Sequence, residues 1–314
     1  MESTLRFWYN LCYELKLAPE DFIDAREDKE KLEELRKSIL DWLSKKVEQG
    51  YDKRTLIAQL QTLQKWLEVQ ILPSYIEQAE YRGKYQTAEL TLEARELLAR
   101  KLIEKARKSK RNHRKDYALT IRSIIFLYYT GSRAESLTNF AIEGEIKIEW
   151  DQFVKAYGET EFVIIKTEEK GKKGSKFTWR KLVPKSWAHL IPQRNLTEDE
   201  LSKIRRILRE TLNEMLNEHP ELFNKDTVKY IRDLSKVLHL WRHTFARDAL
   251  RAFKWNRYLV AKLGGWVKDS NLQIYGDFDL ISLIQEASKE HQIIFAREEV
   301  KKEIEQFLNE VEAF

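Results

Sequence analysis

This sequence has almost no cysteine or methionine. Its 314 residues include one Cys and two Met. The single cysteine, Cys12, excludes an internal disulfide and any metal site built from several thiolates. Abundant lysine and glutamate beside so little Cys and Met fit a heat-adapted source.

Long apolar runs are also absent. No stretch approaches the roughly 18 apolar residues of a membrane span, and no apolar segment follows positive charge as in a secretion signal. The sequence also lacks the motifs of metal and nucleotide chemistry. These are the P-loop, the HExxH motif, the Cys/His spacing of zinc sites and the acidic cluster of two-metal enzymes. We therefore expect a protein of the cytoplasm, or of the nucleoid of a host cell, that needs no membrane, no metal and no cofactor.

The charge is unevenly distributed along the chain. Residues 1–85 contain 14 Lys and Arg against 16 Asp and Glu, a net charge of −2. The totals are 56 and 51, so the remainder has 42 against 35, a net charge of +7. A polyanionic partner is therefore expected to bind the carboxyl-terminal part.

The chain is long enough for about two domains, and the first of them has a helical pattern. Apolar residues recur at helical spacing in 3–15, 28–49 and 53–70. Pro73 and the polar segment 81–87 then interrupt the pattern before a new helix near Leu92. These breaks predict three parts: a helical domain at 1–82, a linker at 83–90 and a second domain at 91–314.

The second domain opens with a basic stretch. Between Lys101 and Arg133 the sequence has ten Lys and Arg against two acidic residues. Such a run is either a solvated face or a strip that contacts DNA phosphates and releases their counterions. The candidates for DNA contact within it are Lys105, Arg107, Lys108, Lys110, Arg111 and Arg114.

Further helices are expected on either side of a β-hairpin. Ile121–Tyr129 is apolar almost all round, which predicts a buried helix that ends at Gly131. Thr197 and Glu200 form a capping-box pattern at the start of another helix.

Between these helices, residues 145–184 have strand periodicity. EIKIEW (145–150), EFVIIKT (161–167) and FTWRKLVP (177–184) are predicted strands, and the last two are joined by a long glycine-bearing turn. Lysines on the hairpin either keep an exposed edge from pairing or reach into a site. They are Lys166, Lys170, Lys172, Lys173 and Lys176.

The segment from His239 to Tyr275 has the residues most typical of phosphate chemistry. His239 and Arg242 are three apart, so a helix presents them on one face, and a guanidinium can bind phosphate with two parallel bonds. A Gly-Gly-Trp step ends at Trp266, and Tyr275 follows nine residues later. Taken singly, each of these is more often a core or surface residue. Their order, together with Arg133 upstream, favours a phosphate site.

Five motifs occur in the order found in the tyrosine recombinases, and the sequence resembles that family. They are TGSRAESL, a lysine-bearing β-hairpin that ends in VP, HLWRHTFA, LGGW and Tyr275. The resemblance covers about 90–290 as the catalytic domain and, more faintly, 1–80 as the helical core-binding domain that clamps DNA. It implies a mainly α fold with a small antiparallel β-sheet. Most members have histidine at the position of Trp266, and in having tryptophan there the sequence is similar to the Cre-type members. The source is expected to be an archaeal virus or plasmid.

The resemblance also implies a role for each residue. Arg133 and Arg242 clamp the scissile phosphate, and His239 hydrogen-bonds it and assists proton transfer. The indole of Trp266 contacts a phosphate oxygen, and Tyr275 is the nucleophile.

The lysine that protonates the leaving 5′-hydroxyl is expected to be Lys166, with Lys170, Lys172 and Lys173 as alternatives. DNA contacts are expected from Lys172 and Lys173 as well. The family usually has an acidic residue three positions after the first arginine. Here Ser136 is at that position, and Glu135 comes one earlier.

We therefore expect a site-specific recombinase that acts through a 3′-phosphotyrosine, without metal or ATP. Its expected partner is double-stranded DNA with specific attachment sites, on which it forms a homotetramer across two duplexes, with a monomer or weak oligomer in the absence of DNA. The alternatives are a topoisomerase IB-like relaxing enzyme and a non-cleaving DNA-binding protein. An amphipathic stripe near the carboxyl end is expected to dock within its own domain or on a neighbouring protomer. It comprises Val300, Ile304, Phe307, Leu308 and Val311.

Overall fold

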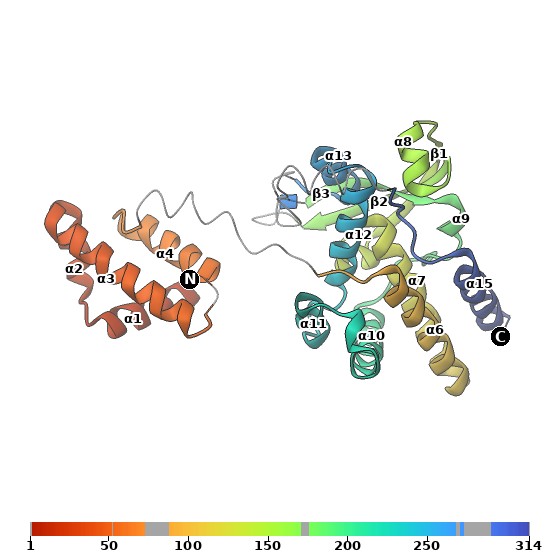
Figure 1. Cartoon of the computed structure of the whole chain (residues 1–314), viewed down its shortest axis with the longest axis horizontal. Helices are drawn as coiled ribbons and strands as arrows, with labels where there is room; N and C mark the ends of the chain where they lie inside the picture. The colour runs from red at the N-terminus through yellow and green to blue at the C-terminus, as the bar shows by residue number, and fades with distance from the viewer. Residues whose placement is uncertain are drawn as a thin grey trace. The chain divides into compact units, whose positions relative to one another are not determined.

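The chain folds as a mainly α protein with one small antiparallel sheet, as the sequence predicted (Figure 1). The structure, a computed structural model, describes residues 2–51, 53–72, 88–170, 176–267, 271–272 and 290–313. It divides into two compact units, Met1–Lys84 and Tyr85–Phe314, and each has its own apolar core.

The first unit is helical in its described residues. Helices α1 (Glu2–Leu15), α3 (Lys29–Glu48) and α4 (Lys53–Leu67) match the predicted runs, and α2 (Pro19–Glu27) was not predicted. Proline suits the first position of α2 because that position needs no backbone donor, and the carboxylate of Asp21 accepts from the backbone N–H of Ala18 at 2.7 Å. Leu60 and Leu63 of α4 are fully buried, as expected from the helical spacing of apolar residues in 53–70.

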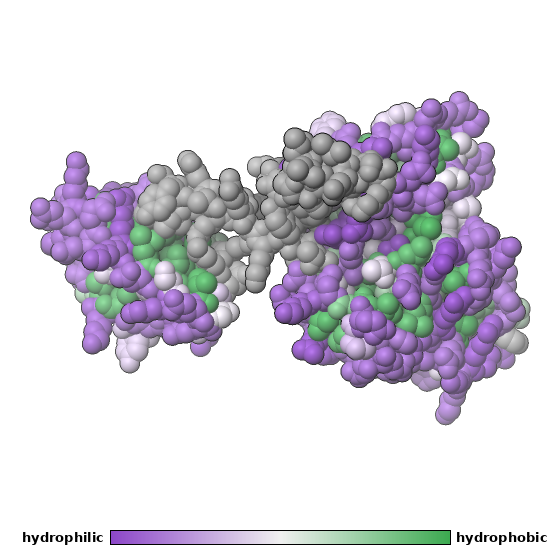
Figure 2. All heavy atoms as spheres, viewed as in Figure 1, coloured by the Kyte–Doolittle hydropathy of each residue, from purple (hydrophilic) through white to green (hydrophobic). Residues whose placement is uncertain are grey.

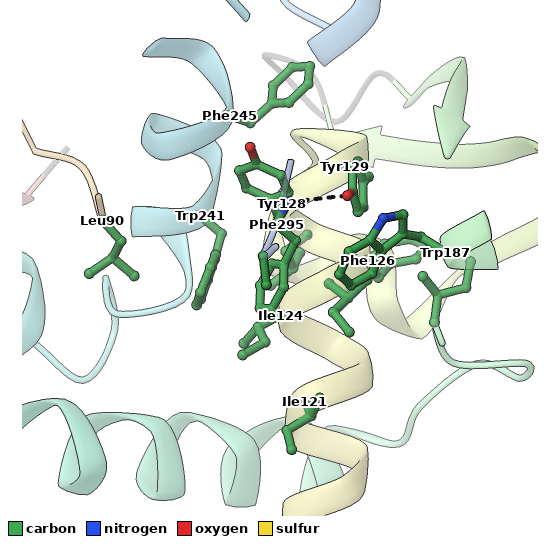
Figure 3. Close-up of a cluster of buried hydrophobic side chains, with 14 of the residues drawn as sticks. Leu90, Ile121, Ile124, Phe126, Tyr128, Tyr129, Trp187, Trp241, Phe245 and Phe295 are labelled. Carbon is green, nitrogen blue, oxygen red and sulfur yellow. Dashed lines mark hydrogen bonds between the residues drawn. The ribbon is translucent and has the colours of Figure 1, made fainter. Parts of the chain in front are cut away.

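Helix α7 (Arg111–Thr130) is the central helix of the second unit. It contacts α6 (Leu92–Lys108), α10 (Glu198–Glu218) and α12 (His239–Ala252). Its last turns are buried on nearly every side, as predicted, and Figure 3 shows Tyr128 and Tyr129 packed among Trp187, Trp241 and Phe295. The hydroxyl of Tyr129 accepts from the backbone N–H of Phe295 at 3.1 Å, so α7 also fixes the segment that leads to the carboxyl end.

The sheet has the order β1 (Phe140–Lys147), β2 (Glu161–Lys170) and β3 (Lys176–Pro184), with antiparallel pairing throughout. Lys166 is paired with Arg180, and Ile165 with Lys181. Because neighbouring residues of a strand point to opposite faces, Lys166 and Lys181 lie on opposite faces of the sheet.

One local prediction in this region was wrong, and one helix was not predicted. The first strand begins at Phe140 instead of residue 145, and it contains a bulge between Ile142 and Gly144. After it, Asp151–Tyr157 forms the short helix α8, which the sequence did not predict. Phe153 of α8 packs against Phe162 and Phe253, with ring centroids 5.2 Å and 5.4 Å apart. A helix of two turns owes its stability to such contacts more than to its own propensity.

The remaining helices include α9 (Lys185–Ala188), α11 (Lys225–Arg232), α13 (Arg257–Gly264) and α15 (Glu298–Glu312). Helix α15 packs on α6 and α7 of its own unit and buries Val300, Ile304, Phe307 and Leu308. Two ion pairs, Arg100 with Glu303 and Arg297 with Glu96, lie at its edges. The apolar stripe of the tail is thus buried against helices of its own domain.

Hydrophilic side chains dominate the visible face of both units (Figure 2), as expected for a chain with 34% charged residues. None of the helices in the described ranges is both long and apolar enough to cross a membrane.

Candidate active site

Arg242 joins three parts of the second unit. It lies on α12 with 3% of its surface exposed, and its Nη1 donates to the carbonyl oxygen of Gly131 at 2.7 Å. Its Nη2 lies 3.5 Å from the carbonyl oxygen of Gly265. Gly131 and Gly265 are the left-handed residues that end α7 and α13. One guanidinium therefore fixes the ends of two helices relative to a third.

Glycine is required at both helix ends. The φ angles of Gly131 and Gly265 are +57° and +70°, a region that residues with a Cβ adopt at a cost. A Cβ at Gly131 would lie 2.4 Å from the ring of Phe245. A Cβ at Gly265 would lie 2.2 Å from Nζ of Lys181. The backbone thus approaches these side chains more closely than any other residue type allows.

Trp266 follows Gly265 and lies against Arg242. The guanidinium carbon is 4.1 Å from the centroid of the indole ring, a cation–π geometry. The indole also stacks on Phe245, with ring planes only 6° apart. Trp266 is half-buried, so one part of its ring supports Arg242 while another part is open to a ligand.

His239 lies one turn before Arg242 on α12. Burial, followed by the positive charges of Arg242 and Arg133, lowers its pKa to about 4, and both arginines therefore lie near the imidazole. Its ring lies edge-on to that of His243, 4.8 Å away. Tyr230 of α11 packs against His243 at the same distance. His239 is therefore neutral at pH 7 and able to accept or donate a hydrogen bond.

Arg133 is the exposed member of the group. It immediately precedes a short 3-10 helix, Ala134–Thr138, in which Ser136 is fully buried and Glu135 is exposed. The charge of Glu135 opposes the arginines by raising the pKa of His239. Glu135 thus lies close enough to His239 for its charge to act on the imidazole.

The structure brings together Arg133, His239, Arg242 and Trp266, whereas Lys166 lies on the face of the sheet opposite to Lys181. The Lys166 side chain is 42% exposed, and its Nζ lies 3.8 Å from a carboxylate oxygen of Glu143. Arg180 donates to the same carboxylate at 2.7 Å. This face of the sheet is the one opposite to Lys181, and hence to Gly265.

Lys181 lies in this region and is not among the residues predicted from the sequence. It is fully buried on β3 and faces Gly265. Strand alternation provided a signal, since Lys181 occurs in phase with the buried Val183 and opposite the buried Ile165. A lysine in an apolar phase is unusual enough to mark a special position.

Several residues of the basic strip have partners inside the unit. Lys105 pairs with Glu214, Arg107 with Glu310 and Lys108 with Glu104. These pairs are largely exposed, so each is weak and open to exchange with a phosphate. The guanidinium of Arg114 donates to the backbone carbonyls of residues 107 and 109 at the end of α6. Lys110 and Arg111 are exposed at the start of α7.

Three predicted residues lie outside the described residues: Tyr275, Lys172 and Lys173. Within the described ranges, no group of three or more His, Cys, Asp or Glu side chains is arranged to hold a metal ion. The side chains that converge around Arg242 are cationic or aromatic, which suits an anion.

Comparison with known proteins gives a distant likeness. No family model and no curated protein matches the chain. Two solved structures match part of the chain: the XerH site-specific recombinase bound to difH substrate, a pre-cleavage complex, and the same recombinase bound to palindromic difH substrate, a post-cleavage complex. Both are 18% identical over 65% of this chain, with TM-scores of 0.34 and 0.35. The chain spans about half the length of these structures, 55% and 53%.

Proposed function

We propose that this protein is a site-specific tyrosine recombinase that cleaves and rejoins DNA strands through a covalent 3′-phosphotyrosine on Tyr275. The observation that carries the proposal is the convergence on Arg242. This buried guanidinium is bonded to the Gly131 carbonyl two residues before Arg133, lies on Trp266 and is one turn from His239.

The chemistry requires positive charge around a phosphodiester. Attack by the tyrosine oxygen forms a P–O bond to the enzyme, breaks the bond to the 5′ oxygen and concentrates negative charge on the non-bridging oxygens. Arg133 and Arg242 are suited to bind those oxygens with paired hydrogen bonds. Neutral His239 is suited to donate one hydrogen bond and to move a proton, and the indole N–H of Trp266 to donate another.

The departing 5′ oxygen needs a proton, and a lysine of the β2–β3 hairpin is the proposed donor. Lys166, Lys170, Lys172 and Lys173 are the candidates. Each Lys→Ala variant is compared on an ordinary phosphodiester and on one whose 5′ leaving oxygen is replaced by sulfur, which departs without a proton. The true donor is the lysine whose loss slows only the oxygen substrate. A variant slowed equally on both substrates is not the donor.

The proposed substrate is double-stranded DNA, met in the cytoplasm or nucleoid. Residues 1–82 are proposed to clamp it, with the basic strip at the start of the second domain supplying phosphate contacts. Recombination between two sites needs four active sites, so a homotetramer on two duplexes is proposed. The net charge of +7 on the carboxyl-terminal part supports DNA as its partner.

A covalent-trapping experiment tests the function. The protein is incubated with nicked suicide duplexes that carry candidate attachment sites, and the products are separated on a denaturing gel. A detergent-resistant adduct that Tyr275→Phe abolishes supports a tyrosine nucleophile. Joined products from two duplexes then distinguish a recombinase from a topoisomerase IB-like enzyme, which relaxes supercoils without joining duplexes.

Two outcomes contradict the proposal. An adduct that persists in Tyr275→Phe would move the nucleophile to another residue. Tight, sequence-specific binding with no adduct on any bound DNA would identify a DNA-binding protein that does not cut.

A further inference from the structure

Lys181 is a buried cation in the apolar face of a β-sheet. It is fully buried on β3, directly opposite the fully buried Ile165 of β2, and Val183 lies two residues further on the same face. Burying an ammonium costs several kcal/mol before its contacts compensate. An aliphatic residue would suit this position better for stability alone, so the lysine is expected to serve another purpose.

Its ammonium lies against one peptide of the candidate active site. A Cβ at Gly265 would be 2.2 Å from Nζ of Lys181 and 3.1 Å from its Cε. The indole of Trp179, which lies under the ammonium at 5.7 Å from the ring centroid, closes the other side of the same space. The end of the Lys181 side chain therefore occupies the volume that any residue larger than glycine at 265 would need.

The same peptide is also linked to Arg242 and Trp266. The carbonyl oxygen of Gly265 lies 3.5 Å from Nη2 of Arg242, and the next residue is the tryptophan that stacks on that guanidinium. The N–H groups of Gly265 and Trp266 are both bonded to the carbonyl of Ala261. A change at Lys181 therefore displaces the Gly265–Trp266 backbone and, with it, the contact between Arg242 and Trp266.

Depth distinguishes the role of Lys181 from that of the phosphate ligands. Arg133 is exposed, Trp266 is half-buried, Arg242 is 3% exposed and Lys181 is 0% exposed. A side chain with no exposed surface has no direct contact with DNA. Lys181 must therefore affect DNA cleavage through the residues that lie between it and the surface.

We propose that Lys181 is a positioning residue that fixes the Gly265–Trp266 backbone so that the indole lies on the Arg242 guanidinium. The effect on the Trp266–Arg242 geometry is independent of the reaction, whereas the effect on cleavage rests on the proposed function.

The first test uses Lys181→Met, which keeps the length of the side chain and removes its charge. Lys262→Met is the matched control, because Lys262 is an exposed lysine of neighbouring α13. The readout without DNA is the indole ¹⁵N–H resonance of Trp266, assigned with Trp266→Phe. The Met variant at 181 is expected to shift this resonance, and the variant at 262 is not.

The second readout is single-turnover formation of the covalent adduct. Misplacing a ligand of the phosphate by a fraction of an ångström is expected to slow cleavage by about ten- to a hundredfold in Lys181→Met. The Kd for DNA is expected to stay within about twofold, because buried Lys181 makes no contact with the duplex. A purely structural role would slow cleavage and weaken DNA binding together through unfolding, which a melting curve detects. If the Met variant does not fold, Lys181→Gln takes its place.

A double substitution sharpens the test. Alanine at 265 displaces the ammonium, so adding Lys181→Met to Gly265→Ala is expected to slow cleavage little further. Fully additive losses, or a folded Lys181→Met protein that cleaves at the parent rate, overturn the inference even if the Trp266 resonance moves. An unshifted resonance overturns it too. If the parent protein forms no adduct on any DNA and the resonance still shifts, the proposed function fails while the positioning role stands.

Discussion

The guanidinium of Arg242 lies 4.1 Å from the centre of the Trp266 indole and donates to the carbonyl of Gly131 at 2.7 Å. Both contacts need a planar guanidinium, since an ammonium has neither the flat face for stacking nor the spread donors. Arg242 is thus placed by its neighbours before any ligand arrives, and the cost of ordering it is met during folding.

Replacing Arg242 by lysine is therefore expected to act as a severe change. The ammonium loses the bond to Gly131 or the contact with Trp266, and adduct formation should fall by about a hundred- to a thousandfold. Single-turnover cleavage on a suicide duplex measures this. Arg232→Lys, at an exposed arginine of α11, is the control and should cleave at the parent rate. A rate for Arg242→Lys within about threefold of the parent would contradict the placement of Arg242 on the phosphate.

Comparing Gly131→Ala with Gly158→Ala separates the cost of backbone strain from the cost of a steric clash. Gly131 and Gly158 both end helices with positive φ, +57° and +68°. A Cβ at Gly158 meets nothing within 4 Å, whereas one at Gly131 would lie 2.4 Å from Phe245. Gly158→Ala should cost about 1 kcal/mol from backbone strain alone, and Gly131→Ala about 2 kcal/mol more because Phe245 must move.

Hydrogen exchange of the amides of α7 measures these costs within the second unit. The Gly131→Ala variant should also cleave more slowly, since Phe245 stacks on Trp266. Equal losses of protection in the two variants would show that the contact with Phe245 is easily relieved.

Buried imidazoles make the second unit sensitive to acid. Burial, followed by nearby positive charge, lowers the pKa of His239 to about 4 and that of His243 to about 3. In the unfolded chain both have a pKa of about 6.5. Between these values the unfolded state binds more protons, so stability is fully present above about pH 6.5 and is lost as the pH falls toward 4.

The contribution of His243 is isolated by His243→Gln. This variant should lose about 2 kcal/mol less stability than the parent between pH 7.5 and pH 5. Hydrogen exchange of α12 amides at the two pH values provides the measurement. His113→Gln, at an exposed histidine, is the control for the loss of an imidazole outside α12. Parallel profiles for His243→Gln and the parent would show that His243 titrates normally in the folded protein.

The fold is largely predictable wherever the residues that stabilise an element lie within the element itself. Ile121–Tyr129 is apolar almost all round, and α7 is buried on nearly every side there. The hydroxyl of Thr197 accepts from the N–H of Glu200 at 3.2 Å while the carboxylate of Glu200 accepts from the N–H of Thr197 at 2.9 Å, so the capping box was predicted correctly. Helix α8 was missed because its stability comes from distant rings such as Phe253, which no local pattern reveals.

The candidate site was predictable only in part for a related reason. Motif order identified Arg133, His239, Arg242 and Trp266, which the structure brings together. The resemblance predicts a catalytic lysine on the exposed hairpin, whereas Lys181 lies in the buried phase of β3, where lysine is rarely found. The contact between Lys181 and Gly265 joins residues 84 positions apart, so it depends on tertiary structure that the sequence pattern does not specify.

Glu89 connects the start of the second unit to the helix that bears His239 and Arg242. Its carboxylate accepts from Nε of Arg247 at 3.0 Å and from Nη1 of Arg251 at 2.8 Å. The backbone beside it is bonded too, since the N–H of Leu90 donates to the hydroxyl of Thr244 at 3.0 Å. Burial alone would raise the pKa of Glu89, but the two arginines outweigh it, and the pKa is lowered.

Glu89→Gln should therefore weaken the attachment of residues 88–90 to α12. Breaking a mostly buried ion pair costs about 3 kcal/mol, which exchange of the Leu90 amide should report at pH 7. Because a lowered carboxyl pKa stabilises the fold above about pH 4.3 and this stabilisation is lost as the pH falls further, parent and variant should converge in acid. Glu310→Gln, in the exposed pair with Arg107, should change protection by less than about 0.5 kcal/mol. Equal effects of the two substitutions would mean that Glu89 contributes no more than a surface ion pair.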